Sequence, residues 1–269
     1  MTVATAQASA PPSPSTAAPP HGLPARAVAV LAGVVCHGTF LLGVLSMIVG
    51  LHEGLRTGFG RLEGWAAVLA DAALVLQFPI LHSLLLTRGG GKLLARLVPL
   101  GLGRALATTT YATFASLQTL VTFALWSPIG PVLYEVQGPA RPVVQALYAA
   151  SWLLVVVAMH QAGLGVQSGS LGWLAVARGR QPVYGSFPTG GLFARCRQPI
   201  YGAFALTLWT GPVLTADRLA LAVAWTGYCV LGPILKERRY VTWHGDAFRA
   251  YQARVPFLLP SLRARKEAA

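Results

Sequence analysis

Two clusters of polar residues in the last quarter of the chain are the residues best suited to chemistry. The first, at 195–202, reads Arg-Cys-Arg-Gln-Pro-Ile-Tyr-Gly. The second starts at 236 with Lys-Glu-Arg-Arg-Tyr and continues through His-Gly-Asp at 244–246 to Val-Pro at 255–256. The apolar stretch between the clusters is long enough only for a tight helical hairpin, which would return both clusters to the same membrane face. This arrangement predicts a binding site rather than a simple anchor.

Glu237 and Arg197 are the charged candidates in these clusters. A carboxylate at the mouth of a membrane cavity suits an ammonium or sulfonium ligand, and the chain has only eight acidic residues. The alternative for Glu237 is an interfacial salt bridge with the basic residues around it. Arg197 is either the partner of an anion or a positive anchor at the membrane surface, a role that Arg195 would serve equally well.

Pro199 and Tyr201 follow at positions that favour the start of a helix. Proline is well suited to the first helical turn, and Tyr201 would then face the same entrance from that turn. The alternative for Tyr201 is an ordinary aromatic residue of the membrane interface.

Two further polar residues, Asp71 and His82, lie in an early apolar stretch. Their separation of eleven residues is almost three helical turns, so Asp71, Val75, Phe78 and His82 form one stripe. For Asp71 we favour a satisfied structural network. His82 is close to the end of the stretch and is a candidate to line the pocket or to act as a base on a thiol.

The composition is that of an integral membrane protein. Of 269 residues, 54% are hydrophobic and only 11% are charged, which leaves too little polar surface for a soluble protein of this size. The net charge of +13 lies at the ends of apolar spans, which argues against a nucleic-acid partner. The three cysteines lack metal or disulfide spacing, and no residue set predicts a metal site.

Apolar stretches predict an all-α bundle of about five to six transmembrane helices. We place helices near 27–51, 66–87, 105–126 and 144–166, and a short hairpin at 200–215 and 218–235. With six spans both termini share one side, which carries 17 Lys and Arg residues against 4 on the other. The positive-inside rule therefore predicts two cytoplasmic termini and a cytosolic pocket. The membrane that we expect is the bacterial inner membrane.

The remaining segments have simpler interpretations. Residues 1–25 predict a disordered tail rich in Ala, Pro and Ser, residues 26–260 a single transmembrane domain, and residues 261–269 a basic tail. The Gly-rich segment 167–199 is either a linker or a cap over a recessed pocket, because irregular backbone beside a bilayer needs protein or water to satisfy its polar groups.

The C-terminal residues resemble the signature of the membrane-embedded methyltransferases. That superfamily includes isoprenylcysteine carboxyl methyltransferases, phospholipid methyltransferases, NnrU-like proteins and bacterial methanethiol S-methyltransferases. Its pattern is an Arg-His-Pro-x-Tyr-x-Gly-like start, a hairpin, a Glu-Glu or x-Glu-Arg pair, then aromatic residues and Val-Pro. The matching residues here are Arg197, Gln198, Pro199, Tyr201, Gly202, Glu237, Arg238, Phe248, Tyr251, Val255 and Pro256.

Upstream residues resemble the methanethiol branch of this superfamily. They are Leu81-His82-Ser83, Thr110-Tyr111 and the stretch 178–189, so that the likeness covers roughly 65–260. The resemblance implies that S-adenosylmethionine is the methyl donor and that Glu237 binds the amino group of this donor. It also implies that Gln198, Pro199, Tyr201 and Arg238 contact the donor. Two positions depart from the pattern: Gln198 replaces the family His, and Lys236 replaces the first Glu of the pair.

The resemblance thus implies a methyltransferase that acts on a small thiol, converting methanethiol to dimethyl sulfide, with His82 and Arg197 as candidate catalytic residues. One alternative is an isoprenylcysteine carboxyl or lipid-amine methyltransferase with a lipid-like acceptor and a lateral apolar opening. A second alternative is a non-catalytic NnrU-like membrane protein, for which Gln198 is the best argument.

Overall fold

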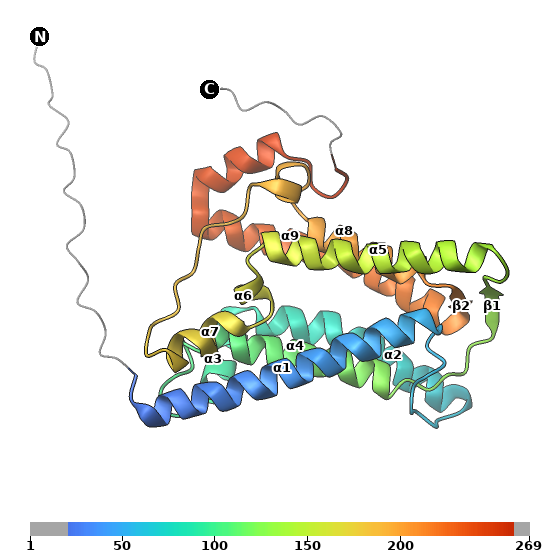
Figure 1. Ribbon diagram of the computed structural model, residues 1–269, viewed down its shortest axis with the longest axis horizontal. Coiled ribbons are helices and arrows are strands. Elements are labelled where there is room, and N and C mark those ends of the chain that lie inside the picture. Colours follow the sequence, from blue (N-terminus) through green and yellow to red (C-terminus); the bar gives the residue numbers. More distant parts are fainter. Residues whose placement is uncertain (1–20, 261–269) are drawn as a thin grey trace, which may run out of the picture.

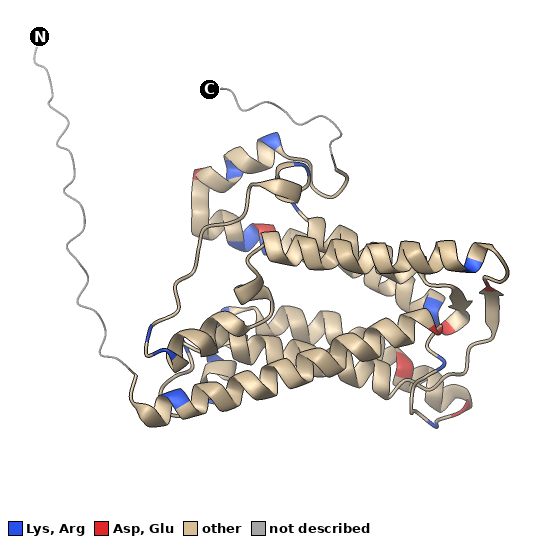
Figure 2. Cartoon of the chain, viewed as in Figure 1, with Lys and Arg blue, Asp and Glu red and all other residues tan. Residues whose placement is uncertain are grey.

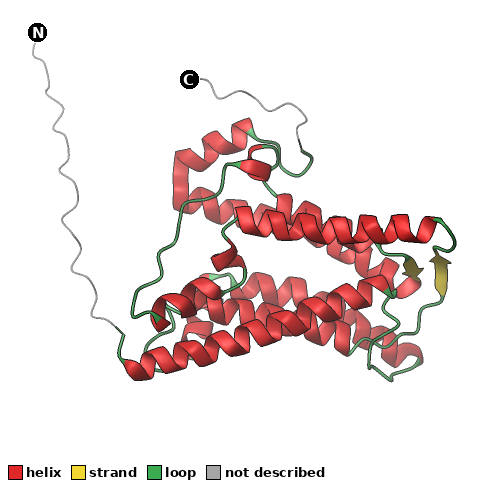
Figure 3. Cartoon of the chain, viewed as in Figure 1, coloured by secondary structure: helices red, strands yellow, loops and turns green. Residues whose placement is uncertain are grey.

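The computed structural model describes residues 21–260, and most of these residues are helical (Figure 3). Two short strands, β1 (Val132–Glu135) and β2 (Val213–Thr215), form an antiparallel pair. The helices are α1 (Leu23–His52), α2 (Gly64–Leu85), α3 (Arg88–Arg96), α4 (Ala107–Ala124), α5 (Ala140–Gln161), α6 (Leu164–Gln167), α7 (Ser170–Ala177), the 3-10 turn η1 (Gly191–Ala194), α8 (Pro199–Thr210) and α9 (Ala216–Arg254). The predicted all-α class is confirmed.

Four of the helices in the described part of the chain are long and apolar enough to cross a membrane, namely α1, α2, α5 and α9. The predicted spans at 105–126 and 200–215 do form helices, α4 and α8, but neither meets this criterion. The helix α8 has only 12 residues, or about 18 Å of length. The helix α4 carries buried polar side chains, among them Thr109, Gln118 and Thr122, that bond within the bundle.

The helices form two layers (Figure 1). One layer contains α1, α2, α4 and α7, and the other contains α5, α8 and α9. Small residues allow α1 to approach α4 closely, since a Cβ on Gly43 would lie 2.7 Å from the Ser116 carbonyl oxygen. The layers are joined where the Trp225 indole donates to the Val75 carbonyl at 3.1 Å and where the Tyr148 hydroxyl donates to the Ile48 carbonyl at 2.7 Å.

The predicted hairpin is formed by α8 and α9, with β2 as its turn. Pro199 occupies the first turn of α8, as predicted. Thr215 caps α9 by accepting from the Arg218 backbone N–H at 3.0 Å. The buried Arg218 guanidinium donates to the carbonyls of Leu208, Gly211 and Val213, which satisfies acceptors that the end of α8 would otherwise leave without partners.

The second helix of the hairpin is longer than predicted. We expected it to end near 235, but α9 continues to Arg254 with a bend at Gly245, whose φ of 54° and ψ of −130° are not helical. The polar sequence 236–244 is therefore part of a helix and not a loop. The side chains before the bend and those after it consequently project from two helical segments that meet at an angle.

The first and last described helical residues and most basic residues lie at one end of the bundle. The start of α1 and the end of α9 lie at the same end (Figure 1), and most Lys and Arg residues lie there too, whereas acidic residues gather at the end with β1 and β2 (Figure 2). Of the tail predicted at 1–25, residues 1–20 are outside the described part and α1 already begins at Leu23. The predicted basic tail, 261–269, is also outside it.

Candidate active site

A buried ion pair joins the two polar clusters. The Nε atom of Arg197 donates to Oε1 of Glu237 at 2.9 Å, and Nη2 donates to Oε2 at 3.2 Å. The two side chains are only 12% and 8% exposed. Arg197 immediately precedes the hairpin and Glu237 follows its apolar part, so the fold brings together two residues that the sequence analysis selected independently.

Both oxygens of Glu237 have further donors. The Gln198 amide donates to Oε1 at 2.7 Å, and the Gln252 amide donates to Oε2 at 2.7 Å. A carboxylate offers about four lone-pair sites, and the two bonds from Arg197 complete that number. The carboxylate in this structure therefore orients protein side chains. Gln252 was missed by sequence reasoning because it lies 15 residues from Glu237 in a stretch of unremarkable composition.

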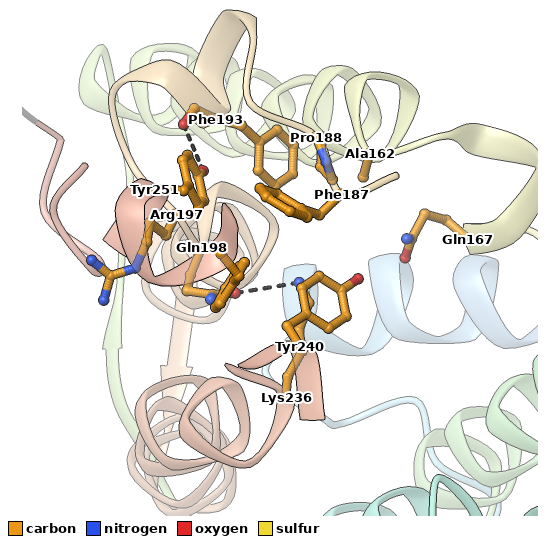
Figure 4. Close-up of a pocket in the computed structure, with 11 residues that line it drawn as sticks. Ala162, Gln167, Phe187, Pro188, Phe193, Arg197, Gln198, Lys236, Tyr240 and Tyr251 are labelled. Atoms are coloured by element: carbon orange, nitrogen blue, oxygen red, sulfur yellow. Dashed lines mark hydrogen bonds between the residues drawn. The ribbon is translucent and has the colours of Figure 1, made fainter. Parts of the chain in front are cut away.

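Gln198 links Glu237 to a second cation. Its side chain is 2% exposed, and its Oε1 accepts from the Lys236 ammonium at 3.4 Å (Figure 4). The amide thus donates to one residue of α9 and accepts from the preceding one. An amide suits this place because it offers a donor and an acceptor at the same time, which gives the substitution of Gln for the family His a structural role.

Lys236 lies between two aromatic rings. Its Nζ atom is 5.7 Å from the centroid of the Tyr201 ring and 5.4 Å from that of the Tyr240 ring. An ammonium at such distances is attracted by the electron-rich ring faces. Tyr201 therefore contacts the charged part of the site from the first turn of α8, as predicted, although the cation that it meets belongs to the protein.

These residues border a cavity of about 350 Å³, counting the part that is open to solvent. Figure 4 shows its lining, contributed by the end of α5, the segment 187–198 and both parts of α9. Phe187 packs against Tyr251 and Phe248, with ring centroids 5.5 and 5.1 Å apart. The full lining is Ala162, Gln167, Phe187, Pro188, Phe193, Arg197, Gln198, Lys236, Tyr240, Phe248 and Tyr251.

The segment 167–199 supplies part of this lining and also connects the two layers. The helix α7 packs on α1 and α4, and the irregular stretch after it reaches the other layer, where Phe187 and Phe193 border the cavity (Figure 3). The Tyr251 hydroxyl donates to the Phe193 carbonyl at 2.7 Å and fixes this stretch. Both interpretations of the segment, linker and cap, therefore describe a part of it.

Arg197 also holds the C-terminal segment in place. Its Nη1 atom donates to the carbonyls of Gln252, at 2.9 Å, and Val255, and its backbone N–H donates to the Pro256 carbonyl at 2.9 Å. The neighbouring Cys196 thiol lies 3.0 Å from the Leu258 carbonyl. Burial raises the pKa of the Cys196 thiol above its ordinary value, although Gln198 and Arg197 oppose this shift. Cys196 is thus a buried thiol rather than a nucleophile.

A second, more apolar groove lies on the other side of the ion pair. It has a volume of about 810 Å³, counting its open part. Arg238, a predicted cofactor residue, borders this groove and not the cavity of Lys236. The groove is lined by Arg197, Ile234, Glu237, Arg238, Val241, Gln252 and Phe257.

His82 is not among the residues that line the cavity or the groove. Its ring stacks on Phe78 at 4.8 Å and meets the rings of Tyr111 at 5.1 Å and Tyr228 at 6.3 Å. Tyr228 precedes Lys236 by eight residues on α9, about 12 Å along the helix axis. The structure thus brings His82 and Tyr111 together, and His82, unlike Arg197, lines neither the cavity nor the groove.

Asp71 has a structural contact, as we favoured, but its carboxylate is only half satisfied, because the buried Oδ2 atom has no hydrogen-bond partner among the described residues. Its Oδ1 atom accepts from the Ser127 backbone N–H at 3.0 Å. The predicted stripe on α2 faces α9, because Val75 and Phe78 both contact Trp225. Asp71 therefore fixes the chain after α4 and takes no part in either polar cluster.

Comparison with known sequences identifies the family of the chain. The chain is 30% identical over 221 residues to the methanethiol S-methyltransferase of Pseudomonas deceptionensis, which covers 80% of each protein. It belongs to the methanethiol S-methyltransferase family. Relatives of the same name from Bradyrhizobium diazoefficiens and Mycobacterium tuberculosis are 27% and 29% identical over 90% and 72% of the chain, and over 93% and 78% of their own lengths. No family profile matches the chain, and no solved structure matches it.

Family membership makes the chain a membrane methyltransferase, an enzyme that requires a methyl donor. This excludes the non-catalytic alternative. Sequence reasoning missed several residues that line the cavity of this family member, above all Lys236, which it treated as a departure from the pattern, and Tyr240. The sequence signal that could have identified them is that Tyr240 follows Lys236 by four residues, a spacing that places both side chains on one face of a helix.

Proposed function

We propose that the chain transfers a methyl group from S-adenosylmethionine to methanethiol and releases dimethyl sulfide. The observation that carries the proposal is the similarity, over most of the chain, to several proteins named methanethiol S-methyltransferase. The cavity lining is compatible with a small acceptor, because its side chains are mainly aromatic and apolar and none is acidic.

The residues around the cavity fit the chemistry of this donor. Faces of aromatic rings attract a sulfonium cation and stack on an adenine base, and Phe187, Tyr240, Phe248 and Tyr251 present such rings. Bound there, the donor supplies a methyl group activated by a positively charged sulfur. Gln198 lines the same cavity and directly precedes α8, and Tyr201 contacts the lining residue Lys236, so we assign Gln198, Pro199 and Tyr201 to the donor site. A donor contact of Arg238, which borders the adjoining groove, stays a prediction.

Glu237 contributes to this site by positioning other side chains. Its carboxylate holds Arg197 and Gln198 in fixed orientations. An amino group of the donor would reach it by displacing the Gln198 or Gln252 amide. Fixed hydrogen-bond donors beside an aromatic cavity suit a displacement at a methyl carbon, since alignment of the nucleophile matters more than proton transfer.

The orientation and the domain assignment are part of the same proposal. The site lies at the end of the bundle where Lys and Arg residues gather (Figure 2), and we place this end in the cytoplasm of the bacterial inner membrane, where the donor is available. We assign residues 26–260 to one transmembrane catalytic domain. A base role for His82 stays a prediction, because His82 lies outside the cavity.

Headspace gas chromatography tests the reaction. Cells that express the chain and cells with an empty vector are fed methanethiol, and the purified protein is given S-adenosylmethionine with a deuterated methyl group. We expect dimethyl sulfide above the vector control, and deuterium in the product of the purified protein. Dimethyl sulfide without deuterium would contradict the assigned donor. Absence of dimethyl sulfide would contradict the assigned acceptor.

One observation favours a second candidate, methylation of a lipid-like acceptor. The groove beside Arg197 and Glu237 is lined by Ile234, Val241 and Phe257, which suits an apolar chain. The same deuterated donor distinguishes the candidates. Deuterium in the extracted membrane lipids or prenylated peptides, with none in dimethyl sulfide, would favour the lipid-like acceptor.

A further inference from the structure

The described residues that line the cavity include few charged groups and no acidic residue or histidine. Of the residues that line it, all within the described range 21–260, only Arg197 and Lys236 carry a formal charge, and none is Asp, Glu, His or Cys. A small acceptor inside this cavity would therefore meet positive charge and aromatic rings, with no carboxylate, imidazole or thiol among the lining side chains.

Arg197 has little capacity left for a ligand. Three of its nitrogen atoms donate to the Glu237 carboxylate and to two backbone carbonyls. Figure 4 shows its guanidinium turned away from the other lining side chains. Because the Glu237 carboxylate also neutralises its charge, Arg197 adds little positive potential to the cavity.

Lys236 is different, because its ammonium has no acidic partner. Within residues 21–260 no carboxylate lies within 4.0 Å of its Nζ atom, whose polar contact is the neutral amide of Gln198 at 3.4 Å. The rings of Tyr201 and Tyr240 flank it. A cation in such weakly polar surroundings interacts strongly with an anion, because few water molecules screen it.

A thiol acceptor requires such help. The thiolate is the nucleophile, and an ordinary alkanethiol is mostly protonated near neutral pH. With no carboxylate or histidine among the lining residues, a nearby positive charge is the group that favours ionisation, because it stabilises the thiolate relative to the thiol. The same charge would hold the sulfur in place for attack on the donor.

We propose that Lys236 is a catalytic residue whose ammonium binds the methyl acceptor as its thiolate, an inference that rests on the proposed thiol methyltransferase function. The thiol loses its proton to water, and the thiolate electron pair forms the new sulfur–carbon bond. The bond between the methyl carbon and the donor sulfonium breaks, and its electron pair leaves a neutral thioether. Both formal charges disappear, so Lys236 no longer attracts the product.

Two acceptors of similar size and different acidity test the assignment. Ethanethiol and 2,2,2-trifluoroethanethiol differ mainly in acidity, since fluorine withdraws electrons and favours the thiolate. We compare the full-length protein with Lys236→Met and Lys236→Gln, measuring kcat/KM for both thiols and the Kd for S-adenosylmethionine. Lys236→Arg keeps the charge, and Lys92→Met is the matched control at an exposed lysine of α3.

We expect the neutral variants to lose about 10- to 100-fold in kcat/KM on ethanethiol, a range typical for removal of one electrostatic stabiliser of a reacting anion. The loss on the fluorinated thiol should be several-fold smaller, with the donor Kd unchanged, and Lys236→Arg should recover most of the activity. A neutral variant that binds S-adenosylmethionine with an unchanged Kd is folded, so its loss of kcat/KM does not come from misfolding.

Two results would overturn the inference. The first is an equal loss of kcat/KM on both thiols, which would show that Lys236 does not act on the ionisation of the acceptor. The second is a weaker donor Kd as the main effect, which would assign Lys236 to the donor carboxylate, the other anion that could occupy this place. If instead the unmodified protein methylates no thiol, the proposed function itself fails, and this result is distinct from both.

Discussion

The guanidinium of Arg197 and the carboxylate of Glu237 form a buried, two-point ion pair across 40 residues of sequence, at 2.9 and 3.2 Å. The pair lies between an aromatic cavity that Lys236 borders and an apolar groove that Glu237 borders. It therefore fixes the start of α8 to the second half of α9 and holds the C-terminal segment through the remaining donors of Arg197. Residues far apart in sequence thereby become one site.

Removal of one partner of the Arg197–Glu237 ion pair should lower the stability of the protein. Glu237→Gln leaves the Arg197 charge buried without compensation, and we expect a loss of about 3–5 kcal/mol in the free energy of unfolding, measured by denaturation in detergent. Donor affinity, measured by calorimetry on the protein that remains folded, should fall as well. The double variant Arg197→Gln/Glu237→Gln should recover part of the stability, since no charge is then left unpaired.

The exposed carboxylate of Asp246 offers a control for this experiment, since it is fully exposed and lies 4.0 Å from Arg249. Asp246→Asn should leave the unfolding transition unchanged. A Glu237→Gln variant as stable as Asp246→Asn would contradict the assigned structural role of the ion pair.

Substitution of Gln198 should lower activity and stability more than substitution of Gln181. Gln181 belongs to residues 180–185, whose sequence is similar to that of residues 197–202. Gln198→Ala removes a buried amide that contacts both Glu237 and Lys236, and leaving such groups without partners costs about 1–3 kcal/mol. Gln181→Ala changes an exposed side chain in the equivalent position of Arg-Gln-Pro-x-Tyr-Gly. Dimethyl sulfide production and the unfolding midpoint should fall only for Gln198→Ala, and equal effects would argue against a specific bridging role.

The bend in α9 should depend on a glycine. At Gly245 a Cβ meets no other atom, but the φ of 54° strains any other residue, so Gly245→Ala should cost about 1–3 kcal/mol. It should also lower activity, because Phe248 and Tyr251 reach the cavity from the segment after the bend. Gly227→Ala is the matched control, since its Cβ likewise meets no atom and its helical backbone favours alanine by about 1 kcal/mol. Unfolding midpoints and product formation measure both, and an unaffected Gly245→Ala variant would show that the bend is dispensable.

The Cys196 thiol should react slowly with alkylating reagents. Burial raises its pKa, so the folded protein keeps this proton to higher pH than the unfolded chain does. The resulting stabilisation is present below the ordinary pKa of a thiol and is lost as pH rises through the raised value. With Cys36→Ala and Cys229→Ala, mass spectrometry should show slow maleimide labelling between about pH 7 and 9.

An exposed thiol provides the comparison for Cys196. Gln181→Cys, combined with Cys196→Ala in the same background, places a cysteine on the surface. It should label at the rate of an unhindered thiol. Labelling of Cys196 at the same rate would mean that its segment opens readily, and the contacts of the thiol with the carbonyls of Phe257 and Leu258 would then not describe the protein in solution.

The sequence by itself determined the class of the fold and the position of the site. Long apolar stretches admit only helices in a bilayer, because every backbone polar group must bond within its own segment. Proline at 199 and the polar clusters on either side of the hairpin are local signals, so α8, its partner helix and the residues Arg197, Gln198, Tyr201 and Glu237 were all identifiable.

Only the tertiary structure decided how these residues are used. The polar stretch 236–244 has no apolar run to mark it as helix, yet α9 continues through it, and the His244 ring at its end packs against Phe187. The partners of Glu237 come from three separate parts of the chain, and such pairings depend on long-range geometry that no spacing encodes. For the same reason the fold, and not the sequence, leaves His82 outside the cavity lining and places Lys236 in that lining without a carboxylate within 4.0 Å among residues 21–260.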